Sequence, residues 1–172
     1  MHDALRALNQ VVLDGVIEKY AIGGAVGAAF YIEATQTADV DVFAYLEPTS
    51  SGLVTLEPIF DALVKLGGIS EEGHVRFGEW PIQILSDATP LIAEAIAEAI
   101  DVPFDEIPTR VFTAEHLCAV ALQAGRPKDY LRVTMFFEQD AVDRVALQEL
   151  ARRHGLLDEL GRVLPEIRGT SI

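Results

Sequence analysis

Hydrophobic residues recur along the chain with two different periods. Near the beginning, Leu5, Leu8, Val12 and Val16 follow one another at intervals of three or four residues, which predicts an amphipathic helix over residues 3–19. Other stretches with this period begin at a proline or a capping threonine, or stop at a glycine, as helices commonly do. They predict further helices over residues 25–33, 53–66, 90–100, 113–125, from Pro127 onward, 140–154 and 156–164.

The strand-like period of two is clearest over residues 39–45. One face of this predicted strand is apolar, and the opposite face carries two carboxylates. The two faces consist of Val40, Val42 and Ala44 on one side and of Asp39, Asp41 and Phe43 on the other. Shorter strands are predicted over residues 20–22 and 107–112, and a hairpin is predicted from residues 74–77 and 81–85 around Gly78-Glu79.

The order of these elements predicts the fold class. Strands and helices mix over residues 1–112, whereas residues 113–172 show helical periodicity alone. We therefore expect an α+β fold in which a mixed central sheet is flanked by helices and a C-terminal helical segment packs on this core. Because no linker-like composition separates the two parts, we expect them to form one unit.

Composition narrows the classes of function. Half of the 172 residues are hydrophobic, so the chain can build a substantial core. The 27 acidic residues outnumber the 13 basic ones, and the formal net charge is -14. This charge excludes general binding to duplex nucleic acid, which requires a basic face, but it is compatible with a local phosphate pocket or a basic protein partner.

The sequence also predicts a cytoplasmic protein. Cys118 is the single cysteine, lies in an apolar helical stretch and is expected to be a buried thiol. The first residues lack the pattern of a signal peptide. The apolar run over residues 21–32 is shorter than the ~20 residues that span a bilayer.

Two features carry candidate chemistry. Gly23-Gly24 follows the predicted strand over residues 20–22, and glycines at such a turn let the backbone approach a ligand closely. Asp39 and Asp41 are two residues apart on a strand, so both carboxylates can meet one divalent ion, for which Mg²⁺ is well suited. The alternative for an isolated pair of this kind is a polar strand face that points to solvent.

Together these residues resemble a known signature. Gly23-Gly24, an intervening helix and Thr37-x-Asp39-x-Asp41 resemble the motif of the polymerase-beta-like nucleotidyltransferase superfamily. Glu115-His116-Leu117 and the segment Gly125-Arg126-Pro127-Lys128-Asp129 resemble the helical motif of its small bacterial branch, which includes the AbiEii-type toxins of abortive-infection and toxin–antitoxin systems. The resemblance spans most of residues 20–137.

The resemblance implies a nucleotidyltransferase fold and the metal-assisted transfer of a nucleoside monophosphate from an NTP to an RNA or protein hydroxyl. It implies that Asp39 and Asp41 hold Mg²⁺ or Mn²⁺. A nucleotide would be bound by Gly23, Gly24, Thr37, Arg126, Lys128 and Asp129. For Arg126 and Lys128, the residues alone also fit a solvated helix face.

The chain departs from the family pattern at four positions that bear on catalysis, one of which is Ala25, where serine is common and alanine also occurs. Gln83 stands where a third carboxylate is expected to help activate the acceptor, and an amide cannot accept a proton at neutral pH. Ala121 stands in place of a lysine and Arg132 in place of an aspartate. An active enzyme that uses Gln83 as its third site residue, a catalytically degenerate protein that binds nucleotide or a cognate partner, and a structural αβ protein therefore remain three alternatives. Glu79 and Asp87, near the ends of the predicted strand, are candidate substitutes for the missing acid.

Overall fold

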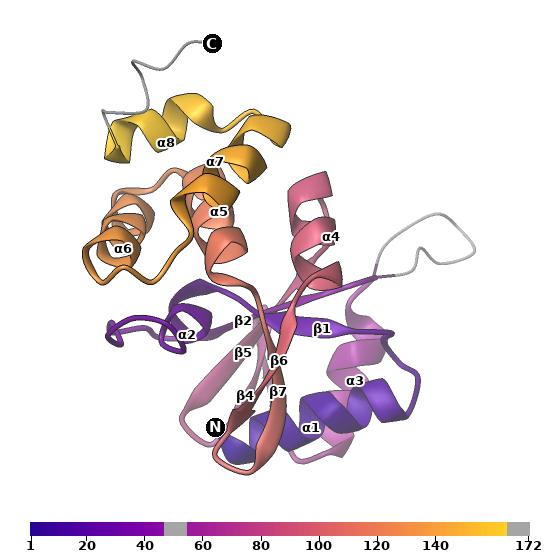
Figure 1. Ribbon diagram of the computed structural model, residues 1–172. Coiled ribbons are helices and arrows are strands. Elements are labelled where there is room, and N and C mark those ends of the chain that lie inside the picture. The colour runs from indigo at the N-terminus through magenta and orange to yellow at the C-terminus, as the bar shows by residue number, and fades with distance from the viewer. Residues whose placement is uncertain (47–54, 165–172) are drawn as a thin grey trace.

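The computed structural model describes residues 1–46 and 55–164 and contains one mixed sheet with helices on both faces (Figure 1). Among these residues the sheet has seven strands in the order β3-β4-β5-β2-β1-β7-β6. The strands are β1 (Tyr20–Ile22), β2 (Val40–Ala44), β3 (Ile69–Glu71), β4 (His74–Phe77), β5 (Trp80–Ser86), β6 (Ile100–Phe104) and β7 (Ile107–Val111). The helices are α1 (His2–Leu13), α2 (Gly24–Ala28), α3 (Glu57–Lys65), α4 (Pro90–Ala97), α5 (Ala114–Ala124), α6 (Pro127–Glu138), α7 (Arg144–Arg153) and α8 (Leu157–Val163).

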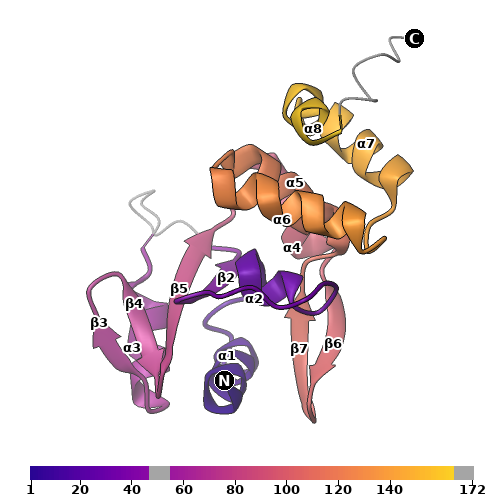
Figure 2. The same ribbon diagram turned by 90° about the vertical axis from the view of Figure 1, so that its left-hand side faces the viewer.

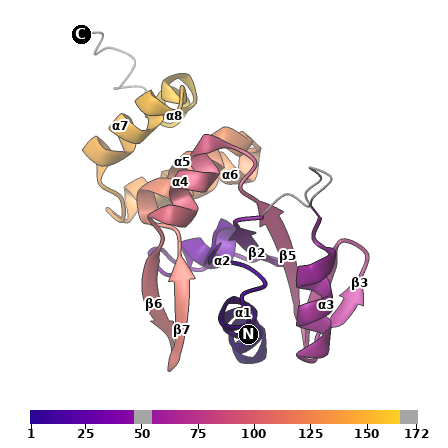
Figure 3. The ribbon, with the colours of Figure 1, turned by 90° about the vertical axis from the view of Figure 1, so that its right-hand side faces the viewer.

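The alternation of β2 divides the core into two layers. Val40, Val42 and Ala44 are fully buried in a cluster with α1 and α3 on one face of the sheet. Phe43 points to the other face and belongs to the cluster that α4, α5, α6, α7 and α8 complete. Figures 2 and 3 show α1 on one side of the sheet and the helices from α4 onward on the other. The predicted α+β fold with a mixed central sheet is confirmed.

The middle of the sheet combines parallel and antiparallel pairs. Strand β2 pairs antiparallel with β1 and parallel with β5, and β1 also pairs parallel with β7. The predicted strand over residues 20–22 and the predicted hairpin of β4 and β5 are both confirmed. The end of β1 therefore lies beside β2, at the place where the glycine turn begins.

Several predicted boundaries were wrong. The first helix ends at Leu13 and not at residue 19, because the chain turns at Gly15, whose φ of 70° is left-handed. The helix predicted over residues 25–33 is confined to α2, and the helix over residues 90–100 ends at Ala97. The last two helices are also shorter than predicted, since α7 covers only part of the span 140–154 and α8 only part of the span 156–164. The first residues of the helix predicted over residues 53–66 lie outside the described part of the chain.

Two edge strands escaped prediction. Within the described ranges, β3 pairs with β4 alone and β6 with β7 alone, so each lies at an edge of the sheet. Their side chains are mostly exposed or half-buried, and they lack the clean alternation that marks a strand packed on a core. Ile100, which had been assigned to the preceding helix, is the first residue of β6.

The helices after β7 form the layer above the glycine turn. Thr113 caps α5 by accepting a hydrogen bond from the backbone N–H of His116, and α5 ends at Gly125 in a left-handed conformation. Helix α6 begins at Pro127 with Arg126 as its cap residue, as the sequence predicts. Helix α5 packs against α2, α4, α6 and α7, so the start of α6 is held near the sheet.

Within residues 1–46 and 55–164, no helix combines the length and apolar character needed to cross a membrane.

Candidate nucleotide and metal site

Gln83, which stands where a third carboxylate is expected, lies directly beside Asp41. In the parallel pairing of β2 with β5, Asp41 and Gln83 are register partners, so their side chains emerge next to each other on one face of the sheet. The backbone N–H of Gly23 donates to the carbonyl oxygen of Asp41 at 3.0 Å. This bond holds the turn between β1 and α2 against the middle of β2.

The two glycines are required by close packing at this turn. A Cβ atom on Gly24 would lie 1.8 Å from Asp41 Oδ2, and Gly24 has a left-handed φ of 57°. A Cβ atom on Gly23 would lie 2.5 Å from Cε2 of Phe43. Any side chain at Gly24 would therefore displace the Asp41 carboxylate, which links the glycine turn to the aspartate physically.

Thr37 positions the other aspartate of the pair. Its hydroxyl lies 3.1 Å from the carbonyl oxygen of Asp39 and 3.3 Å from Asp39 Oδ1, with both oxygens placed to accept its hydrogen. Asp39 immediately precedes β2 and is half-buried. The predicted nucleotide-binding residue Thr37 therefore serves first to fix the strand entry and one Asp39 oxygen.

The pKa of Asp41 depends on the burial of its carboxylate and on the charges of nearby residues. Burial is the main cause that raises the pKa of Asp41 above its usual range, and the negative charge of Asp39 adds to this effect. Positive charges on α6 oppose it, and they come from Arg132, Arg126 and Lys128 in that order. The site therefore places two acidic groups of the sheet opposite a basic stretch of α6. A divalent cation between the carboxylates would offset both effects that raise this pKa.

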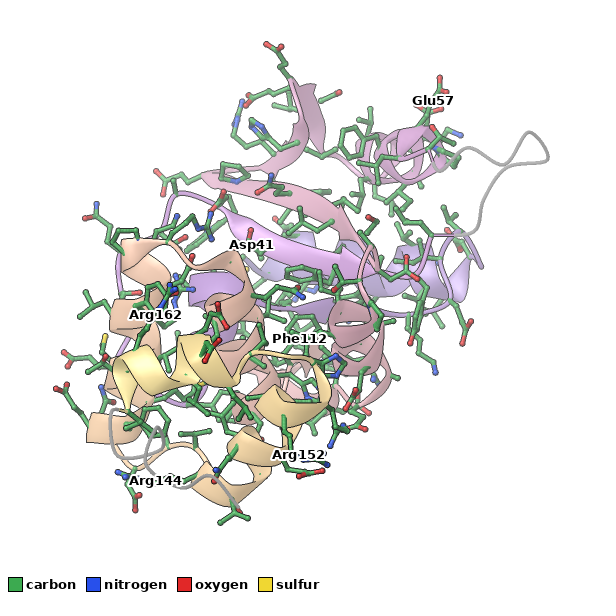
Figure 4. All side chains as sticks on the ribbon, turned by 90° about the horizontal axis from the view of Figure 1, so that it is seen from above. Asp41, Glu57, Phe112, Arg144, Arg152 and Arg162 are labelled. Atoms are coloured by element: carbon green, nitrogen blue, oxygen red, sulfur yellow. The ribbon has the colours of Figure 1, made fainter. Side chains whose placement is uncertain are left out.

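A cavity of about 740 Å³ joins these elements. Asp41, Gly24 and Gln83 line it from the sheet. Apolar side chains form another part of the wall, namely Phe43, Leu85, Ile92, Phe112, Leu117 and Val120. Figure 4 looks through the helices on to the sheet and labels Asp41 and Phe112, two of the lining residues. This apolar wall was missed in the sequence, although Leu117, Val120 and Ala124 share one face of α5 at helical spacing.

The basic side of the cavity is organised around Asp129. This side chain is only 1% exposed and accepts hydrogen bonds from Arg126 Nε at 2.5 Å and from Arg132 Nη1 at 3.3 Å. All three residues line the cavity. Nucleotide binding by Asp129 stays a prediction; its carboxylate is engaged by the two arginines and orients them. Arg132 replaces an expected aspartate and brings a further positive charge to the site.

Smaller hollows connect Asp39 and Lys128 to the same region. Asp39, Thr37, Lys128 and Arg132 line a hollow of about 380 Å³. Asp39 and Gln83 share another of about 330 Å³. Gln83 and Arg132 also line the main cavity, so both smaller hollows share residues with it.

Asp39 and Asp41 belong to no group of three metal-ligating side chains in the described part of the chain, although Glu72 lines the hollow that Asp39 and Gln83 share. Across residues 1–46 and 55–164, the one group of at least three His, Cys, Asp or Glu side chains with ligand atoms within 4.8 Å of one another includes neither Asp39 nor Asp41. Glu79 lies in the turn before β5, and Asp87 follows the end of that strand. The amide of Gln83 is therefore the polar side chain of β5 that stands beside Asp41.

Comparison with known proteins identifies the fold. No family model and no curated protein matches the sequence. The structure is similar to that of an antigenic nucleotidyltransferase-like protein from Paracoccidioides brasiliensis, with a TM-score of 0.60 and 16% identity over 96% of this chain and 91% of that chain. The structure of ANT(2'')-Ia in complex with adenylyl-2''-tobramycin is also similar, with a TM-score of 0.44 and 13% identity over 97% of this chain and 94% of that chain. The likeness with a TM-score of 0.60 shows that the chain has a nucleotidyltransferase-like fold, as its motifs predict.

Proposed function

We propose that the chain is a metal-dependent nucleotidyltransferase that binds an NTP in the cavity between β2, β5 and α6. The observation that supports this proposal most directly is the contact of the Asp41 carboxylate with Gly24, opposite the arginines of α6. This arrangement brings carboxylate oxygens, which suit Mg²⁺ or Mn²⁺, together with guanidinium groups, which suit phosphate.

The proposed roles follow from the contacts of each group. Asp39 and Asp41 would hold the divalent cation, which would neutralise phosphate charge and polarise the phosphoryl group. Arg126 and Arg132, oriented by Asp129, would bind phosphate oxygens. Lys128 would add positive charge in the neighbouring hollow that it lines with Asp39. The glycine turn lets the substrate approach β2 without a side chain in the way.

The reaction consistent with these roles is nucleotidyl transfer to a hydroxyl of RNA or protein. The acceptor oxygen would form a bond to the α-phosphorus while the bond from that phosphorus to the bridging oxygen breaks, and pyrophosphate would leave. The acceptor proton would pass to solvent, because Gln83 has an amide where a base would be needed. Positioning and electrostatic stabilisation would then supply the acceleration.

A specific observation favours a second candidate function. Gln83 is in register with Asp41, where an acid would assist catalysis. The alternative is therefore a catalytically degenerate protein that binds nucleotide or a protein partner at the same cavity. Because the sequence resembles AbiEii-type toxins, both candidate functions include binding to a cognate protein partner. The net charge of -14 favours a partner that is basic.

One set of assays separates these functions. The protein is incubated with each α-labelled NTP, Mg²⁺ or Mn²⁺, and RNA or protein acceptors, next to Asp41→Asn and the control Asp61→Asn, which changes an exposed carboxylate of α3. Transfer that is lost only in Asp41→Asn would support the enzyme. Calorimetric NTP binding that depends on Asp41, without transfer, would support the degenerate protein. The absence of both would contradict the proposed site, and Gln83→Glu tests whether a restored acid raises transfer.

A further inference from the structure

Two carboxylates and a histidine come together outside the nucleotide cavity. Glu94 lies in α4, and Glu98 follows four residues later at the end of that helix, so both fall on one helix face. His116 lies in the first turn of α5, which packs against α4. One ligand atom from each residue lies within 4.8 Å of those of the other two, and none of the three residues lines the cavity that contains Asp41.

The histidine is buried and aims an unpartnered atom into this group. The His116 side chain is 3% exposed, and its Nδ1 lies 2.9 Å from Thr113 Oγ1. Its Nε2 is buried without a hydrogen-bond partner among residues 1–46 and 55–164, and it lies 3.8 Å from Glu94 Oε1 and 4.0 Å from Glu98 Oε2. These separations are too long for hydrogen bonds, and a buried polar atom without a partner costs stability.

We propose that Glu94, Glu98 and His116 bind a transition-metal ion such as Zn²⁺, at a site separate from the nucleotide cavity. One imidazole nitrogen and two carboxylate oxygens form a donor set that Zn²⁺ commonly accepts. Around a tetrahedral zinc ion with bonds of about 2.0–2.2 Å, two donor atoms lie roughly 3.3–3.6 Å apart. The distances of 3.8 and 4.0 Å are a few tenths of an ångström longer than this, and small rotations of the two glutamate side chains, of which Glu98 is largely exposed, would close the difference.

Thr113 would support the histidine as a ligand. Its hydroxyl oxygen already accepts the backbone N–H of His116 as the cap of α5. The same oxygen can accept a hydrogen from Nδ1, and this leaves the lone pair of Nε2 directed at the two carboxylates. Metal-bound histidines commonly donate their second ring N–H to such a partner, which fixes the orientation of the ring.

An arginine of α7 competes for the same carboxylate. Arg153 Nη2 contacts Glu94 Oε1, the oxygen that faces His116, while His154 Nε2 lies 2.6 Å from Glu94 Oε2. The Arg153 side chain is 45% exposed and can turn into solvent. Zinc binding would exchange this guanidinium for the ion and leave His154 on the other oxygen. The site therefore links metal binding to the contact between α7 and α4.

The test measures Zn²⁺ binding to the full chain after treatment with a chelator. Calorimetry and elemental analysis are carried out in excess Mg²⁺, which competes at Asp39 and Asp41. We expect one tightly bound Zn²⁺ per chain, also in Asp41→Asn and in the surface control Glu138→Gln. Glu98→Gln should weaken binding about tenfold or more. Arg153→Gln should strengthen it because the competing cation is gone.

The outcomes decide the assignment. A native chain that retains no Zn²⁺, or equal affinity in the native chain and Glu98→Gln, would overturn the site. Loss of binding in Asp41→Asn would also overturn it, since the ion would then occupy the nucleotide cavity. His116→Gln should abolish binding, and circular dichroism shows whether that variant folds. Because Glu98 is largely exposed, Glu98→Gln should leave the fold intact, so it tests the zinc site even if His116→Gln does not fold.

Discussion

Gly24→Ala is the substitution that most directly tests the link between the glycine turn and Asp41. The new methyl group would meet Asp41 Oδ2 at 1.8 Å, and an ordinary contact begins at 3.4 Å, so the carboxylate must retreat by about 1.6 Å. Gly15→Ala is a matched control, because Gly15 also has a left-handed φ, of 70°, but has nothing within 4 Å of the added carbon. The two variants share the backbone strain and differ in the clash.

The expected losses of stability follow from the backbone strain, which both variants share, and from the clash, which only Gly24→Ala has. A left-handed backbone costs an alanine about 1–2 kcal/mol, partly offset by the lower entropy of the unfolded chain. Gly15→Ala should therefore lower the free energy of unfolding by about 1 kcal/mol. Steric crowding typically costs a further 1–3 kcal/mol, so Gly24→Ala should lose roughly 2–4 kcal/mol.

Urea denaturation followed by circular dichroism measures both losses, and nucleotidyl transfer measures the site. A misplacement of about 1 Å can cost roughly 100-fold in rate, so we expect at least that loss for Gly24→Ala and native activity for Gly15→Ala. Equal stability of the two variants would refute the inferred contact between Gly24 and Asp41. Full transfer activity in a folded Gly24→Ala variant would refute the placement of the substrate at this turn.

Three further predictions follow from buried groups. Asp129→Asn should lower the free energy of unfolding by about 2–4 kcal/mol in urea titrations, because Arg132, only 13% exposed, loses its carboxylate partner; an unchanged midpoint would contradict the ion pair. Burial raises the pKa of the Cys118 thiol far above its usual range, so a thiol reagent should label it only after unfolding, and rapid labelling of the native protein would contradict its burial. Burial also raises the pKa of Tyr20 to about 12, so the unfolded chain loses this proton at a lower pH than the folded one. Between pH 10 and 12 stability should therefore fall by about 2–3 kcal/mol, and Tyr20→Phe should show a smaller alkaline loss; identical profiles would contradict the cause.

Local signals in the sequence were sufficient for the elements that build the middle of the fold. The alternation over residues 39–45 predicts β2 and assigns its two faces correctly, because a strand face is set by every second residue. Thr113 and Gly125 mark the limits of α5, because a capping hydroxyl and a left-handed glycine act on the adjacent backbone. By contrast, β3 and β6 were missed, because each forms through pairing with a neighbour rather than through its own pattern.

The sequence by itself determined the α+β class, the glycine turn and the aspartate pair, since these depend on residues close together in the chain. Tertiary structure alone decided that Gln83 stands in register with Asp41, because strand order brings β5 beside β2. It also decided that the arginines of α6 face this pair and that His116 meets two carboxylates of α4. Such contacts join residues that are distant in sequence and depend on helix and strand packing, which periodicity along the chain does not encode.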